Sequence, residues 1–202
     1  MNIHHLAVSP TRAQFCVPSL LVATFWVLFI VMIHVSPVIA GKDTIRIVID
    51  TNEQTLKVFQ GNKETLHFAN IAIGRYGATI DRRKGDHKTP LGRFTIAWIT
   101  DATSFHRFFG LLYPGKEQAI RALQAGVLDQ RTWKTINQAL TAGHLPPQNT
   151  ILGGNLGIHG IGKGDKNIHE QFNWTNGCVA LTNEQIDLLS IWVRKGTSVE
   201  IR

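Results

Sequence analysis

Alternating apolar and polar side chains predict strands at both ends of the larger, C-terminal part of the chain. The alternation covers residues 45–49, 56–71, 93–100 and 197–202. Successive side chains of a strand point to opposite faces, so each segment would bury one face. Gly61-Asn62 interrupts the second segment, which predicts a hairpin that turns there. These segments predict a fold built mainly from β-sheet.

A helical period replaces this alternation in the middle of the chain and again near its end. One helix is predicted over residues 116–125 and stops at Gly126, and a second is capped by Asp129 and ends at Gly143. Farther along, Thr182-Asn183-Glu184-Gln185 matches a capping box that starts a third helix. The predicted fold class is therefore α+β, mainly β-sheet with a few packed helices.

Residues 153–177 differ from both patterns, because they are rich in glycine and poor in large apolar side chains. This composition predicts a shaped surface loop and not core. Loops on a rigid scaffold commonly carry catalytic groups. Candidate functional residues are therefore expected in this segment.

The first forty residues form a separate segment. Residues 16–35 contain no Asp, Glu, Lys or Arg and are long enough to span a bilayer, whereas Val38-Ile39-Ala40 has the small residues of a leader cleavage site. We expect residues 1–40 to be a signal peptide or an uncleaved N-terminal anchor. Either one exports residues 41–202 as a single domain to the periplasm or cell envelope, with membrane contact only through residues 16–35.

The formal net charge of the chain is +7. Such an excess is typical of nucleic-acid binding, but an exported domain seldom meets nucleic acid, so no such partner is expected. Anionic polymers or acidic lipid head groups are the expected counterparts. The run Asp81-Arg82-Arg83-Lys84, together with Lys163 and Lys166, either attracts such partners or forms an ordinary solvated face.

Cys178 and His159 are the candidate catalytic pair. Cys178 is the only thiol in residues 41–202, and a free thiol with a pKa of about 8.5 is mostly protonated near neutral pH. A neighbouring histidine can take the thiol proton and later return one, as nucleophilic acyl transfer requires. Gly177 leaves the backbone free to bend, so the N–H groups of Gly177 and Cys178 could bind a developing oxyanion. The pair suggests covalent acyl chemistry.

Three motifs resemble one known family. His159-Gly160 followed by Thr175-x-Gly177-Cys178 resembles the signature of the L,D-transpeptidase catalytic domain family (YkuD-type). Residues 85–96 are similar to its Gly-Asp-x-x-Thr-Pro-x-Gly-x-Phe/Tyr segment, and residues 150–154 are similar to its approach to the histidine. The resemblance covers roughly residues 44–202.

The resemblance implies a reaction on peptidoglycan stem peptides that needs no cofactor. Cys178 would attack the carbonyl at the L-centre of a diamino acid, expel D-alanine and hold the stem as a thioester, while His159 acts as base and then as acid. Gly160 would orient the imidazole only through its backbone. Substrate contacts are expected from Trp174, Thr175 and Asn176 and from the Thr89-Pro90 turn. The acyl group would then pass to a second stem, to a wall-linked lipoprotein or to water.

Two departures from the family pattern bear on the product. Asn176 stands where the commonest form has histidine, and Ala180 stands where many members carry Arg or Asn. Both are found in a branch that includes hydrolases of peptidoglycan linkages, so transfer and hydrolysis both stay open.

Two further classes of protein remain as alternatives. A zinc protein could use His159, His169 and Cys178 as ligands, although a structural site needs a fourth group. A non-catalytic module could instead bind the cell wall through the basic face and the Phe and Trp side chains.

Overall fold

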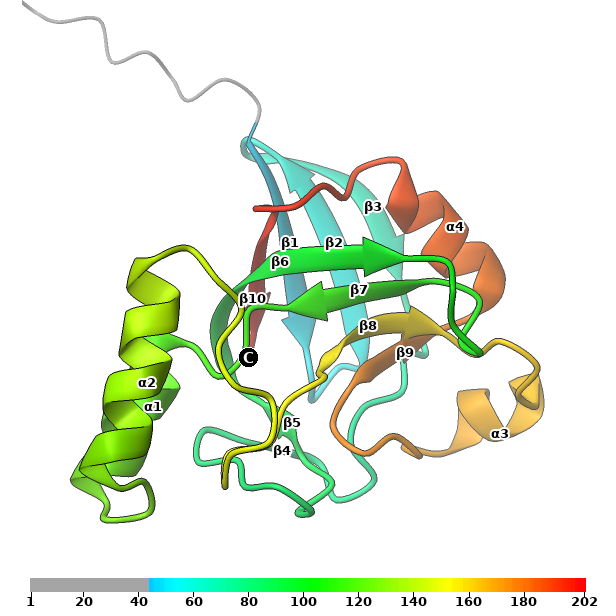
Figure 1. The fold of residues 1–202 in the computed structure, drawn as a ribbon. Coiled ribbons are helices and arrows are strands. Elements are labelled where there is room, and N and C mark those ends of the chain that lie inside the picture. Colours follow the sequence, from blue (N-terminus) through cyan, green and yellow to red (C-terminus); the bar gives the residue numbers. More distant parts are fainter. Residues whose placement is uncertain (1–43) are drawn as a thin grey trace, which may run out of the picture. The chain divides into compact units, whose positions relative to one another are not determined.

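The computed structural model describes residues 44–202, which form one mixed sheet of eight strands with four helices around it (Figure 1). The order of strands across the sheet is β3-β2-β1-β10-β6-β7-β8-β9. Their bounds are β1 (Ile45–Asp50), β2 (Thr55–Gln60), β3 (Lys63–Phe68), β6 (Gly92–Thr100), β7 (Phe108–Leu111), β8 (Gly157–Gly160), β9 (Val179–Leu181) and β10 (Ser198–Ile201). A separate pair consists of β4 (Ala78–Thr79) and β5 (Thr89–Pro90). The predicted leader, residues 1–40, lies outside the described residues.

The helices are α1 (Lys116–Gln124), α2 (Gln130–Thr141), α3 (Lys166–Gln171) and α4 (Asn183–Ser190). The predicted cap of α2 is confirmed, since the Asp129 carboxylate accepts a hydrogen bond from the Thr132 N–H. The predicted capping box of α4 is also confirmed, with Thr182 and Gln185 bonded reciprocally. Figure 1 shows α1 and α2 packed side by side, away from α3 and α4. None of the helices in this part of the chain is long and apolar enough to cross a membrane.

The core lies against the sheet and follows the predicted alternation. The antiparallel hairpin predicted to turn at Gly61 is confirmed between β2 and β3. Ile47 and Ile49 of β1 are fully buried, and β1 pairs antiparallel with β2. Its other neighbour is β10, which runs parallel to it with Ile47 opposite Val199. Strands β1 and β10, from the two ends of the described chain, are therefore neighbours in one sheet. Strands β6, β7, β8 and β9 continue the sheet beyond β10.

The prediction of a loop over residues 153–177 is wrong for two parts of that segment, which form β8 and α3. All four residues of β8 are buried. A Cβ atom on Gly157 would lie 2.4 Å from the ring of Phe108, so this glycine permits close packing against a neighbouring strand. The glycines here therefore mark tight contacts as well as turns.

Candidate active site

Strand pairing brings the two predicted catalytic residues to one face of the sheet. β8 and β9 are parallel, with Ile158 opposite Val179 and His159 opposite Ala180. Cys178 directly precedes β9, so its side chain points to the same face as that of His159. Both residues line a cavity of about 320 Å³. The other lining residues are Arg75, Phe105, Phe108, Asn155, Trp174, Thr175 and Asn176.

His159 is held in a defined tautomer by its neighbour. Its Nδ1 lies 2.7 Å from the carbonyl oxygen of Gly160. Because a carbonyl can only accept a hydrogen bond, Nδ1 carries the proton and Nε2 keeps a free lone pair. The rings of Phe105 and Phe108 lie 4.1 Å and 5.7 Å from the imidazole, centroid to centroid. This burial lowers the pKa of His159 to about 4, so the imidazole is neutral at physiological pH.

The Cys178 thiol is also neutral at rest. Burial raises its pKa to about 11, and the nearby Gly157 N–H and Arg82 guanidinium oppose that shift only in part. The thiol donates a hydrogen bond to the Asn155 carbonyl, with Sγ 3.7 Å from the oxygen. Asn155 adopts a left-handed backbone, at φ +52°, to present that carbonyl. The thiol must therefore turn away from Asn155 before His159 can take its proton.

The raised pKa gives an expected pH dependence for chemical modification of Cys178. Only the thiolate attacks iodoacetamide, so alkylation of Cys178 in the free protein should be slow at pH 7 and rise about tenfold per pH unit towards pH 11. Peptide mapping separates Cys178 from Cys16, and the urea-unfolded protein, in which the same thiol is exposed, is the control. A rate that levels off below pH 8 would contradict the raised pKa of the Cys178 thiol.

Thr175 closes the turn of residues 175–178, the nucleophile turn, which carries the candidate nucleophile Cys178. Its hydroxyl donates to the Cys178 carbonyl at 2.6 Å and accepts from the Gly177 N–H at 3.1 Å. In this structure the Gly177 N–H is therefore already used, and its role as an oxyanion donor stays a prediction. The Cys178 N–H has no acceptor within residues 44–202 and is the remaining candidate. At φ +122° a Cβ on Gly177 would lie 2.7 Å from the Lys88 carbonyl, so only glycine fits this turn.

The Thr89-Pro90 turn does not contact the cavity. Thr89 is fully buried, and its hydroxyl accepts a hydrogen bond from the Gly74 N–H at 2.8 Å. Gly74 in turn pairs with Thr175. The threonine hydroxyl thus supports the backbone next to residues 175–178, and the substrate contacts expected from Thr89 and Pro90 stay a prediction that the cavity lining does not support.

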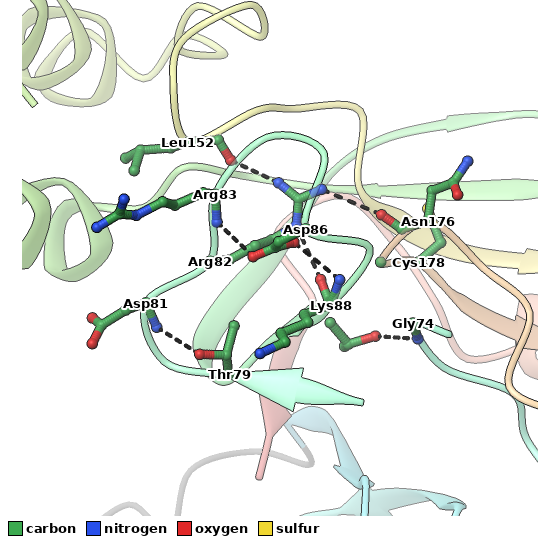
Figure 2. A network of polar contacts seen from close by, with 12 residues as sticks. Gly74, Thr79, Asp81, Arg82, Arg83, Asp86, Lys88, Leu152, Asn176 and Cys178 are labelled. Carbon is green, nitrogen blue, oxygen red and sulfur yellow. Dashed lines mark hydrogen bonds and ion pairs between the residues drawn. The ribbon is translucent and has the colours of Figure 1, made fainter. Parts of the chain in front are cut away.

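Arg82 joins all three sequence motifs (Figure 2). Its guanidinium donates to the carbonyls of Lys88 at 3.0 Å, Leu152 at 2.7 Å and Asn176 at 3.3 Å. The side chain is buried, so the prediction of a solvated or polymer-attracting run over residues 81–84 is wrong for this residue. Each carbonyl belongs to a different segment, and one of them lies two residues before Cys178. Arg82 therefore fixes the nucleophile turn against the rest of the domain.

This geometry agrees with a comparison of the sequence with known families. Residues 44–201 match the L,D-transpeptidase catalytic domain (YkuD). The chain belongs to this family. Members are cysteine-dependent enzymes that act on peptidoglycan peptides. No match was found among curated proteins.

Two solved structures share the fold of this L,D-transpeptidase domain. The helical cell shape determining protein Pgp2 of Campylobacter jejuni is 18% identical, with a TM-score of 0.53, over 79% of this chain and 47% of that one. Bd1075 of Bdellovibrio bacteriovorus is 18% identical, with a TM-score of 0.50, over 79% and 48% of the two chains. This chain therefore spans about half the length of the structures it matches, and the likeness concerns the fold.

The part of the L,D-transpeptidase domain that the structure describes contains no set of side chains that could bind zinc, as the zinc alternative would require. No three His, Cys, Asp or Glu side chains there come close enough together to hold a metal ion. His169, one of the proposed ligands, is buried and lies 3.3 Å from the indole N–H of Trp174, which donates to it. His169 thus supports Trp174 at the edge of the cavity.

Arg75, Phe105, Phe108 and Asn155 complete the cavity. Arg75 and Asn155 were not candidates from the sequence, whereas Phe105 and Phe108 belong to an aromatic stretch, residues 104–109, that could hold sugar or peptide. All four lie outside the three family motifs, and only their position in the sheet brings them to Cys178. Of Arg75 and Asn155, only Asn155 could have been noticed in the sequence, because it follows two glycines and asparagine tolerates the left-handed backbone conformation that it adopts.

Proposed function

We propose that this domain is a peptidoglycan L,D-transpeptidase that acts on stem tetrapeptides through a cysteine thioester. The proposal rests on one observation above all. A neutral imidazole with a free Nε2 lone pair and the only thiol of the described chain line the same cavity. We also propose that the domain is exported to the periplasm or cell envelope, where its substrate lies.

The first half of the reaction acylates the enzyme. The sulfur of Cys178 attacks the carbonyl carbon at the L-centre of the diamino acid while Nε2 of His159 takes the thiol proton. The carbonyl π electrons move to oxygen, where the Cys178 N–H donates a hydrogen bond. Collapse of this intermediate breaks the C–N bond, and the departing D-alanine amine takes the proton from Nε2. A thioester and a neutral imidazole remain.

The two pKa values decide the timing of that proton transfer. Since the pKa of the thiol is about 11 and that of the imidazole is about 4, a thiolate-imidazolium pair is strongly disfavoured in the free protein. The proton must therefore move as the sulfur–carbon bond forms, which removes the cost of a free thiolate.

The second half of the reaction releases the acyl group. An amine of a second stem peptide, or of a wall-linked lipoprotein, attacks the thioester and gives a proton to Nε2. The carbon–sulfur bond breaks, and the sulfur takes that proton back. The product with a second stem is a cross-link between two diamino acids.

Hydrolysis at the same site is the second candidate function. Water in place of the amine gives an L,D-carboxypeptidase, or an amidase where the bond cleaved is a wall linkage. Asn176 and Ala180 favour this candidate, because they depart from the commonest transpeptidase pattern at the cavity and directly beside it. The likeness to Pgp2 supports a role in cell shape for either activity.

Mass spectrometry of tetrapeptide muropeptides incubated with the protein tests the proposal. Dimers joined through two diamino acids are expected if amines take the acyl group. Tripeptide monomers without dimers would favour the hydrolase. Unchanged muropeptides, under conditions in which the protein is shown by circular dichroism to be folded, would contradict both enzyme functions.

A further inference from the structure

The active-site cavity has one charged side chain among the residues that line it, and that side chain is Arg75. The other lining residues are aromatic or carry neutral polar groups, and both Cys178 and His159 are neutral at rest. Arg75 therefore adds a positive charge to the wall of the cavity that an entering substrate meets.

The position of Arg75 beside the nucleophile turn is fixed by several contacts. Its backbone N–H donates to the Thr175 carbonyl at 3.0 Å, next to the Gly74–Thr175 bridge. In its side chain, Nη2 donates to the Asn176 amide oxygen at 2.7 Å and lies 3.4 Å from the Trp174 carbonyl. Asn176 lies two residues before Cys178 and is one of the two departures from the family pattern. Its side chain thus orients the guanidinium of Arg75.

Arg75 differs from the other arginines near the site in having no anionic partner. Arg107 is paired with Asp101 at 2.6 Å, and buried Arg82 lies 3.9 Å from the Asp86 carboxylate and is bonded to three carbonyls. The Arg75 side chain is exposed, and within residues 44–202 it has no carboxylate within 4.0 Å. Its Nε and Nη1 donors have no acceptor there either.

We propose that Arg75 is a specificity-determining residue that binds the terminal carboxylate of the amino acid expelled from the stem peptide. This carboxylate belongs to the residue directly after the attacked carbonyl, so it enters the cavity together with the scissile bond. A guanidinium with unused Nε and Nη1 donors and no anionic partner suits a carboxylate, because hydrogen bonds between two ionised groups are the strong ones. The inference rests on the proposed function, because the carboxylate is that of the donor stem.

Kinetics with paired substrates test this subsite. One tetrapeptide carries a free terminal carboxylate, a second is its terminal carboxamide, and a third has an amide only on the carboxylate of the diamino acid. For Arg75→Gln, kcat/KM on the free tetrapeptide should fall about 10- to 100-fold, mainly through KM, since hydrogen bonds to charged groups are worth that much. The same variant should change kcat/KM on the terminal carboxamide by less than about twofold.

The matched control is Arg131→Gln, which removes one positive charge from an exposed position on α2 and should leave both kinetic constants as in the wild type. Arg75→Lys keeps the charge without the planar fork, so it should recover part of the lost affinity. Equal losses on the free tetrapeptide and its terminal carboxamide would overturn the proposal, because Arg75 would then only support the Asn176 turn. The proposal would also be overturned if Arg75→Gln lowered kcat/KM on every substrate except the third one. That result would mean that Arg75 contacts the carboxylate of the diamino acid and not the terminal carboxylate.

A binding measurement separates this inference from the proposed reaction. In a Cys178→Ala background, calorimetry compares binding of the free tetrapeptide with binding of its terminal carboxamide, with and without Arg75→Gln. A preference for the free carboxylate that depends on Arg75 supports the subsite even if no turnover is found. Tetrapeptide turnover that is the same with and without Arg75 would reject the subsite and leave the proposed function intact.

Discussion

Cys178→Ala is expected to reduce conversion of tetrapeptide muropeptides by about ten-thousand-fold or more, because loss of the nucleophile in such enzymes leaves only the binding contribution to the rate. Mass spectrometry of the muropeptides, with or without an added amine acceptor, measures this loss. The expected loss applies to transfer and hydrolysis alike, since both proceed through the same thioester.

The variant protein should stay folded, which makes the loss interpretable. Cys178 is half-buried, and removing one sulfur atom should lower the free energy of unfolding by only about 1 kcal/mol. Urea denaturation checks this value, and sedimentation with purified cell wall shows whether binding survives. Undiminished turnover would rule out the thiol mechanism, and wall binding by both proteins with no turnover by either would favour the non-catalytic module.

Arg82→Met is expected to have the largest effect on folding. The substitution removes the Arg82 donors to the carbonyls of Lys88, Leu152 and Asn176, of which only Leu152 keeps a second donor, the Tyr113 hydroxyl. Each carbonyl left unsatisfied costs about 1–3 kcal/mol. The free energy of unfolding should therefore fall by about 3 kcal/mol or more, as measured by urea denaturation. Turnover should fall as well, since the Asn176 carbonyl positions the turn before Cys178.

Arg83→Met is the matched control, because Arg83 is exposed and its side chain makes no hydrogen bond or ion pair within the described residues. It should change the free energy of unfolding by no more than about 0.5 kcal/mol. Arg82→Lys should recover only part of the lost stability, because an ammonium group cannot reach three separated carbonyls in one plane. Equal stability of the Arg82→Met and Arg83→Met proteins would contradict the role assigned to Arg82.

Elements that depend on local chemistry could be predicted from the sequence. The Gly61 hairpin, the Asp129 cap and the Thr182 capping box each form between residues close in the chain, so their signals are local. β7, β8 and β9 were not predicted, because short strands buried on both faces show no alternation. Their identity depends on which strands lie next to them.

The same division applies to the site. The positions of Cys178 and His159 could be read from motifs, whereas the roles of Thr89 and Gly177 could not. Both were assigned to substrate or transition state, and the structure uses the Thr89 hydroxyl and the Gly177 N–H for internal hydrogen bonds. Residue type alone does not separate buried Arg82 from exposed Arg75, since burial of an arginine is decided by segments distant in sequence.

The hydrogen bond from His159 to the Gly160 carbonyl has a consequence for acidic environments. In the Ser-His-Asp arrangement a carboxylate stabilises the protonated imidazole, whereas here the partner is a neutral dipole inside an aromatic shell. In the proposed reaction the imidazolium would therefore be a stronger acid than an ordinary imidazolium and would readily protonate the departing amine. For the same reason the free base stays available far below neutrality, down to about pH 4, so an acidified medium would not by itself disable the base.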